Sequence, residues 1–374
     1  MDSRSVLRWK AGFWRTGQRM GMLLHRLAKP TPPIHSLQHS FPAMLSEYPG
    51  EITVYLYVPK DYHQSESRKK YPLMVNFHGG GFTLGCGTDD CRWFATVMEE
   101  TDAIIASVDY RLAPEYPFPT AVDDGADAVL WLVSQAEELG IDLDRGIVLS
   151  GFSAGANLAF TVPLKLDSLR QHSWSSEPSN RVDISAKTKS LLDRTHIVGI
   201  MSWYPPTNYT LSRPERNATN PKPALGLPTT LTSLFDLSYL YPSGCENDVL
   251  LSPALASDEQ LARALPRDIW IYTCEFDDLC NEGKTFAERL HLLSDKSESS
   301  RDPQNETTEA ETTERTSSAT MVDTQNRWGR KEVRYEMIPG VTHGWDKMPA
   351  LSANIVAVES YKGAVESLRE VWMA

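Results

Sequence analysis

The sequence predicts an α/β fold built on a doubly wound, mostly parallel sheet. Two observations support this prediction. Segments with the composition of strands alternate with segments of helical apolar spacing along the 374 residues. The motifs that could perform chemistry directly follow the strand-like segments, at the edge where open α/β sheets bind their ligands.

Seven segments read as strands and four as helices. The strands are expected at residues 52–58, 73–77, 103–109, 147–150, 197–203, 269–273 and 333–338, and the helices at 121–139, 154–166, 283–293 and 352–372. In the first helix Val122, Ala126 and Val129 recur at helical spacing, whereas Asp123 and Glu137 fall on other faces. This alternation of strands and helices is typical of a sheet covered by helices.

The strand expected at 147–150 runs into Gly151-Phe152-Ser153-Ala154-Gly155, where a helix should begin. A sharp turn between a strand and a helix would hold the Ser153 hydroxyl out at the edge of the sheet, and glycines relieve the crowding in such a turn. Ser153 is therefore a candidate nucleophile. Because this pentapeptide also occurs by chance, its catalytic interpretation depends on partner motifs elsewhere in the chain.

The strand expected at 73–77 leads into His78-Gly79-Gly80-Gly81-Phe82. Successive glycines leave backbone N–H groups unshielded by side chains, as a developing oxyanion requires of its donors. The loop could also be a flexible turn or a phosphate-binding loop. No phosphate-binding glycine pattern accompanies it, so acyl chemistry is favoured.

Two later strands end at residues that could activate a serine. The strand at 269–273 is followed by Glu275-Phe276-Asp277-Asp278, and the strand at 333–338 by a segment that contains His343. A serine hydroxyl is a weak nucleophile at neutral pH and needs a base, together with a group that orients the base. An imidazole and a carboxylate at one sheet edge would supply both.

Four blocks in this order resemble the hormone-sensitive-lipase-like group of α/β-hydrolases, which includes carboxylesterases and arylacetamide deacetylases. The blocks are residues 78–82, 109–115, 151–155 and the segments around Asp277 and His343, and the resemblance spans residues 50–372. It implies an α/β-hydrolase fold with a helical cap. It also implies Ser153 as nucleophile, His343 as general acid/base, Asp277 as its orienting carboxylate, an oxyanion hole formed by the amides of Gly79, Gly80 and Ala154, and loop support from His78 and Gly81.

The chain departs from the family pattern at three positions. Phe152 replaces the usual acid before the nucleophile, Ala156 replaces a glycine, and Asp278 stands where the family usually has proline. Adjacent residues point to different sides of an extended chain, so only one of the two aspartates can face the imidazole. The family motif aligns on Asp277, with Asp278 and Glu275 as alternatives.

The resemblance implies a serine carboxylesterase that acts on a small hydrophobic ester and requires no cofactor. Amide, deacetylase or lactone hydrolysis by the same triad is the alternative, followed by a non-catalytic ligand-binding member of the fold, against which His343 counts. The five cysteines are scattered and the histidines do not cluster, so we expect no metal site. Reduced thiols and the lack of a secretory apolar run favour a cytoplasmic protein.

The domain prediction is one catalytic domain, residues 49–374, after an amphipathic cap region, residues 1–48. Leucines, aromatics and prolines in 205–266 favour a packed cap insertion that lines the pocket. Residues 295–326 are almost entirely polar and cannot bury enough apolar area to offset the entropy of ordering. We therefore expect a disordered insert there.

The first thirty residues are basic and amphipathic. No apolar run in them approaches the roughly 20 residues that a membrane span needs. Three interpretations stay open for this segment: a cap helix, as the resemblance implies, a helix that contacts a membrane surface, or a mitochondrial presequence.

The whole chain has a net charge of −12, which argues against nucleic acid as a partner because nucleic-acid binding requires basic residues at the phosphates.

Overall fold

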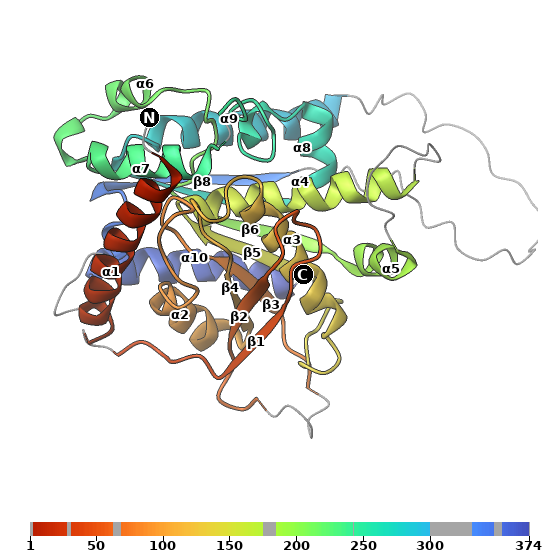
Figure 1. The fold of residues 1–374 in the computed structure, drawn as a ribbon. Coiled ribbons are helices and arrows are strands. Elements are labelled where there is room, and N and C mark those ends of the chain that lie inside the picture. Colours follow the sequence, from red (N-terminus) through yellow and green to blue (C-terminus); the bar gives the residue numbers. More distant parts are fainter. Residues whose placement is uncertain are drawn as a thin grey trace, which may run out of the picture.

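The computed structural model describes residues 3–27, 31–62, 69–174, 185–241, 243–299, 331–347 and 354–373. Within these ranges eight strands form one sheet in the order β1-β2-β4-β3-β5-β6-β7-β8 (Figure 1). The strands are β1 (Leu37–Pro42), β2 (Glu51–Tyr57), β3 (Leu73–Phe77), β4 (Ile104–Asp109), β5 (Ile147–Phe152), β6 (Ile197–Trp203), β7 (Asp268–Phe276) and β8 (Glu332–Thr342). The pairs β1–β2 and β2–β4 are antiparallel and all others are parallel. The predicted doubly wound, mostly parallel sheet is confirmed.

Helices cover both faces of the sheet. One face packs against α2 (Cys91–Thr101) and α10 (Ile355–Met373), and the other against α3 (Thr120–Ser134), α4 (Ala154–Trp174), α8 (Asp258–Ala264) and α9 (Cys280–Ser299), with α5 (Ala186–Arg194) beside α3 and α4. Neighbouring strand residues point to opposite faces, so Val75 joins one core and Met74 the other. The central strands β3, β4 and β5 are mostly apolar because both of their faces are buried.

Strand register brings the candidate site residues to one edge. Phe77 pairs with Gly151, Phe152 with Trp203, and Phe276 with Thr342. His78, Ser153, Asp277 and His343 each follow one of these paired residues. The four motifs therefore meet where the parallel strands end.

Helices from two parts of the chain lie over this edge. They are α1 (Arg4–Leu27), α6 (Arg213–Thr219), the short helix η1 (Pro223–Leu225) and α7 (Thr229–Tyr239); η2 (Pro253–Leu255) and η5 (Trp345–Lys347) are further single turns. Figure 1 shows α1 (red) beside α7 (green), and the two helices are in contact. No helix within the described ranges combines the length and the apolar character that crossing a membrane requires.

All seven predicted strands are present, but β1 and the helices α2, α5 and α8 were not predicted. β1 lies within residues 1–48, so this part of the predicted cap region belongs to the sheet instead. It is an edge strand in which only Phe41 is buried, so it lacks the apolar pattern of the inner strands. The helix predicted at 121–139 ends at Ser134, and turns follow up to Gly140, which has a φ of 64°.

The disordered insert predicted at 295–326 begins too early. Helix α9 continues to Ser299, because residue types such as Lys296 and Glu298 have good helix propensity. Residues 300–326 lie outside the described part of the chain, so disorder there stays a prediction.

Candidate active site

Ser153 lies in the turn between β5 and α4. Its backbone φ of 52° is in the left-handed region, which residues other than glycine seldom adopt and which is typical of a serine held out from a strand-to-helix turn. The Ser153 N–H donates to the carbonyl of Trp203 at 2.9 Å, and its own carbonyl accepts from the Asn157 N–H at 3.1 Å. These bonds stabilise the turn from both sides.

The glycines of the pentapeptide allow the chain to pass close to its neighbours. A Cβ atom on Gly155 would lie 1.9 Å from the carbonyl oxygen of Phe77, and one on Gly151 would lie 2.2 Å from the carbonyl oxygen of Gly155. Side chains at either position would push α4 away from the ends of β3 and β5. The two glycines are therefore needed for packing around Ser153.

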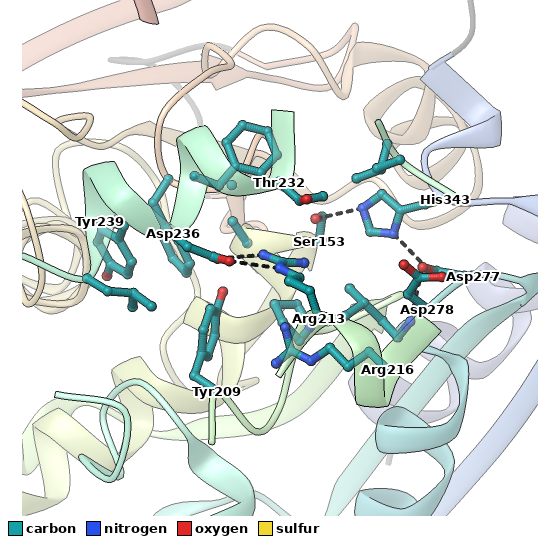
Figure 2. A pocket seen from close by; sticks show the side chains of 18 residues that line it. Ser153, Tyr209, Arg213, Arg216, Thr232, Asp236, Tyr239, Asp277, Asp278 and His343 are labelled. Atoms are coloured by element: carbon teal, nitrogen blue, oxygen red, sulfur yellow. Dashed lines mark hydrogen bonds and ion pairs between the residues drawn. The ribbon is translucent and has the colours of Figure 1, made fainter. Parts of the chain in front are cut away.

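Ser153, His343 and Asp277 form a continuous hydrogen-bonded chain (Figure 2). His343 Nε2 lies 2.8 Å from Ser153 Oγ, and His343 Nδ1 donates to Asp277 Oδ2 at 2.7 Å. Asp277 is buried, and its other oxygen accepts from the Leu279 N–H at 3.1 Å. The imidazole packs edge-on against the Tyr204 ring, with 4.8 Å between centroids. The structure thus brings together the three predicted triad residues in the order that acyl transfer requires.

The rival acids have other partners. Asp278 Oδ1 accepts from Asn220 Nδ2 at 2.8 Å and from Asn217 Nδ2 at 3.4 Å, both near α6. Glu275 Oε2 accepts from the Gly340 N–H at 2.6 Å. Of the three acids, only Asp277 is hydrogen-bonded to His343, as expected if the adjacent aspartates point to opposite sides of the chain.

The glycine loop after β3 is held by His78. This ring is buried, stacks on Tyr110 with 4.2 Å between centroids, and donates from Nδ1 to the Gly79 carbonyl at 2.8 Å. The Tyr110 hydroxyl donates to the His78 carbonyl at 2.8 Å. The Gly80 carbonyl accepts from the N–H groups of Thr83 and Leu84. The carbonyls of the loop are therefore occupied by internal bonds.

The amides of the same loop remain available. Within the described residues, the N–H groups of Gly79, Gly80 and Ala154 donate no hydrogen bond. Ala154 is the first residue of α4, where helical N–H groups have no partner within the helix. A Cβ atom on Gly79 would lie 3.0 Å from the carbonyl oxygen of Phe152, so the loop packs directly against the Ser153 turn. These amides are free to donate hydrogen bonds to a ligand oxygen.

A cavity of ≈ 40 Å³ opens beside Ser153. The glycine loop lines it with Gly81 and Phe82, and the predicted cap insertion lines it with Leu227, Phe235 and Leu240, among others. Arg213 also lines it and binds Asp236 through two bonds of 2.9 and 2.6 Å (Figure 2). The second arginine of the lining, Arg216, is ion-paired with the buried Glu282 at 2.6 Å. The surface of the cavity is thus mainly apolar, and both of its arginines are paired with carboxylates.

A buried charged cluster behind Ser153 was not predicted from the sequence. Lys347 Nζ lies 2.7 Å from Asp346, 3.0 Å from Asp90 and 3.7 Å from the centroid of the Phe152 ring. The Tyr204 hydroxyl donates to Asp346 at 2.6 Å. The cluster therefore connects Phe152, the residue before the nucleophile, with Tyr204, whose ring packs on His343. The one signal in the sequence was the apolar Phe152 where the family has an acid.

The charges of this cluster stabilise one another. Burial alone would lower the pKa of the Lys347 ammonium, but the carboxylates of Asp346 and Asp90 raise it well above its usual value. Burial alone would raise the pKa of Asp346, but Lys347 and two tyrosine hydroxyls lower it below its usual value. Lys347 is therefore a cation on which two buried carboxylates depend.

We predict that Lys347→Met lowers the free energy of unfolding by about 3 kcal/mol, because it leaves two buried carboxylates without a cation. Urea unfolding followed by circular dichroism would measure the change. The control is Lys362→Met, at an exposed lysine on α10, which should change stability by less than about 0.5 kcal/mol. Equal stability of the two variants would contradict the interpretation of the cluster.

Among the residues that the structure describes, no group of three or more His, Cys, Asp or Glu side chains is placed to bind a metal ion. The five cysteines carry free thiols. The expectation that neither a metal ion nor a cofactor is required stays a prediction.

Comparison with known proteins agrees with the fold. The sequence model of the family described as alpha/beta hydrolase fold matches residues 74–306, more than half of the chain. Lipase 2 of Moraxella sp. is 31% identical over 64% of this chain and 55% of its own length, and the arylesterase of Saccharolobus solfataricus is 29% identical over 75% and 79%. An esterase structure from Pyrobaculum calidifontis superposes with a TM-score of 0.66 at 22% identity, over 97% of this chain and 94% of that one.

The eight-stranded sheet and the family match define an α/β-hydrolase. With relatives that are named lipase, arylesterase and carboxylesterase, the chain belongs to the hormone-sensitive-lipase-like carboxylesterase family that its motifs resemble. The chain spans about half the length of the first curated relatives that it matches, 55% of the Moraxella lipase and 40% of a Mycobacterium tuberculosis esterase.

Proposed function

We propose that this protein is a serine carboxylesterase that hydrolyses small hydrophobic esters. The observation on which the proposal rests is the unbroken chain from Ser153 Oγ through the His343 imidazole to the buried Asp277, at the wall of a mainly apolar cavity. Such a chain activates a hydroxyl that would otherwise be a weak nucleophile. The names of the relatives support the same reaction class.

The first half of the reaction acylates the serine. Ser153 Oγ attacks the ester carbonyl while His343 Nε2 accepts the hydroxyl proton, and Asp277 stabilises the resulting imidazolium at Nδ1. The carbonyl oxygen becomes an oxyanion, which the amides of Gly79, Gly80 and Ala154 stabilise. When the tetrahedral intermediate collapses, the ester C–O bond breaks and His343 returns the proton to the leaving alcohol.

Water completes the cycle. His343 takes a proton from a water molecule, the hydroxide adds to the acyl carbonyl, and the same amides stabilise the second oxyanion. Collapse breaks the bond to Ser153 Oγ and releases the carboxylic acid, while His343 restores the serine hydroxyl. Each group ends in its starting state.

Covalent labelling tests the assignment directly. A fluorophosphonate probe should label the protein with one probe molecule per chain. Peptide mass spectrometry should place the adduct on Ser153. Turnover of p-nitrophenyl butyrate should disappear in step with labelling. An adduct on another residue, or labelled protein that keeps its turnover, would contradict the proposal.

We predict that Phe235→Ala widens the accepted range of acyl chains. The Phe235 ring lines the small cavity and lies against Gly81, where an added Cβ would be 2.3 Å from it. Its removal should raise kcat/KM for p-nitrophenyl octanoate, relative to butyrate, by about tenfold, since pocket contacts of this size are worth about 1–3 kcal/mol.

The control for this prediction is Leu225→Ala, which truncates an exposed cap leucine that does not line the cavity. Its ratio of octanoate to butyrate kcat/KM should stay within about twofold of the unmodified protein. If both variants had the same ratio as the unmodified protein, Phe235 would not limit acyl chain length.

A further inference from the structure

Helix α1 exposes a large apolar surface. Seven of the nineteen large apolar side chains that are exposed in the described ranges lie on this one helix: Val6, Trp9, Phe13, Met20, Leu23, Leu24 and Leu27. Trp9 is 72% exposed, Phe13 67% and Met20 68%. Single exposed apolar residues are common on proteins, but a cluster of this kind marks an interaction surface.

The exposed side chains form one stripe. At about 100° per residue, Trp9, Phe13, Met20, Leu24 and Leu27 fall within about 60° of one another around the helix axis. The buried residues, Leu7, Ala11, Met22 and His25, lie on roughly the opposite side. Thus α1 has two apolar faces, of which the protein itself covers only one.

The covered face is attached to the site. Arg15 donates to the carbonyls of Thr83 and Ala113 at 2.9 and 2.7 Å, and Gln18 Oε1 accepts from the Gly85 N–H at 2.8 Å. Beside α1, a groove of ≈ 490 Å³ between α1 and α7 extends the apolar surface toward Leu237 of the cap. These contacts fix the direction in which the stripe faces.

The helix also differs in charge from the rest of the chain. Residues 4–27 contain six Lys and Arg and no Asp or Glu, whereas the whole chain has a net charge of −12. Arg8 and Arg19 are exposed on one flank of the stripe, and within the described residues neither forms an ion pair. A surface that covers the stripe will therefore gain most if it is both apolar and negatively charged.

We propose that α1 docks on the surface of an anionic lipid bilayer. The helix would lie along the interface with Trp9, Phe13 and Leu24 in the upper acyl region, while Arg8 and Arg19 contact lipid phosphates and carboxylates. A second copy of the chain fits less well, because it would bring two basic helices and two acidic bodies together. The proposal concerns binding and is independent of the hydrolytic activity.

Vesicle sedimentation tests the proposal with the full chain. The protein should bind vesicles of phosphatidylcholine with about 30% phosphatidylserine much more tightly than vesicles of phosphatidylcholine alone. Raising the salt from about 0.1 M to about 1 M shortens the Debye length from about 10 Å to about 3 Å and should weaken binding severalfold.

Two variants assign the binding to α1. The triple variant Trp9→Ser, Phe13→Ser, Leu24→Ser should lower the partition coefficient at least about tenfold, because it removes the inserted side chains. The double variant Arg8→Gln, Arg19→Gln should lower it by at least about fivefold on anionic vesicles only. Both should keep full turnover of a soluble ester, since neither changes the Ser153 cavity.

Matched controls carry the same changes elsewhere. Met44→Ser, Leu292→Ser, Ile355→Ser removes three other exposed apolar side chains, and Lys187→Gln, Arg194→Gln removes two exposed charges on α5. Both controls should bind within about twofold of the unmodified protein. The proposal is overturned if the unmodified protein does not bind anionic vesicles, or if the α1 variants bind as tightly as the controls. It is equally overturned if α1 proves to be a dimer contact. In that case the unmodified protein would be a dimer that does not bind vesicles, and the triple variant would be a monomer.

Discussion

Replacing Ser153 with alanine is expected to lower kcat on a soluble p-nitrophenyl ester by about 10⁶-fold, the loss that removal of a triad serine causes. The substitution deletes one oxygen whose hydrogen-bond partner is His343 Nε2 at 2.8 Å. The turn itself is held by backbone bonds to Trp203 and Asn157, which alanine keeps. The thermal midpoint should therefore stay within about 2 °C of the unmodified protein.

A second hydroxyl in the same cavity provides the control. Thr232 of α7 lines the cavity, but its hydroxyl donates to the Thr229 carbonyl, and the ring nitrogens of His343 bond to Ser153 and Asp277 instead. Thr232→Val keeps the shape of the side chain and should retain activity within about tenfold. If Ser153→Ala kept more than about one part in a hundred of the activity, the nucleophile would have to be another group.

The second large effect is expected at Asp277. Asp277→Asn removes the charge that holds the His343 tautomer and stabilises its imidazolium, so kcat should fall by about 10⁴-fold with KM little altered. Asp278→Asn should change kcat by less than about tenfold, because Asp278 contacts Asn220 and Asn217 instead of His343. Kinetics at saturating substrate would separate the two.

Asp277→Asn and Asp278→Asn are controls for each other, because the two substitutions alter charge and volume equally at adjacent positions. A large loss at Asp278 with a small loss at Asp277 would reverse the assignment. Small losses at both positions would transfer the orienting role to another carboxylate, of which Glu275 is the nearest in sequence.

The sheet and its site could be predicted because their signals are local. Ser153 and Asp277 directly follow the buried strands β5 and β7, and His343 directly follows β8, an edge strand that still contains strand-forming residues, so parallel pairing brings all three to one edge. The edge strand β1 gave no such signal, because most of its residues are exposed. Its place in the sheet is set by antiparallel pairing with β2.

The charged cluster behind Ser153 could not be predicted for a different reason. Asp90 and Lys347 are far apart in sequence and meet only when α2 and the segment after β8 pack on one face of the sheet. Nothing in the neighbourhood of Asp90 marks it as the partner of a lysine. In the same way, the amphipathic pattern of the first thirty residues predicted a helical region with an apolar side, but it could not show which face the protein covers.

The hydrogen bond from Asn220 to Asp278 has a consequence for any attempt to redesign substrate preference. Asp277 and Asp278 share one stretch of backbone, so the peptide that positions the histidine's carboxylate is also attached to the cap. Libraries that vary the segment around Asn220 would therefore mix two phenotypes, altered selectivity and a displaced carboxylate, and would discard variants with useful pockets as inactive. Diversity placed at Leu227 and Phe235, with Asn220 held constant, would keep those phenotypes separate.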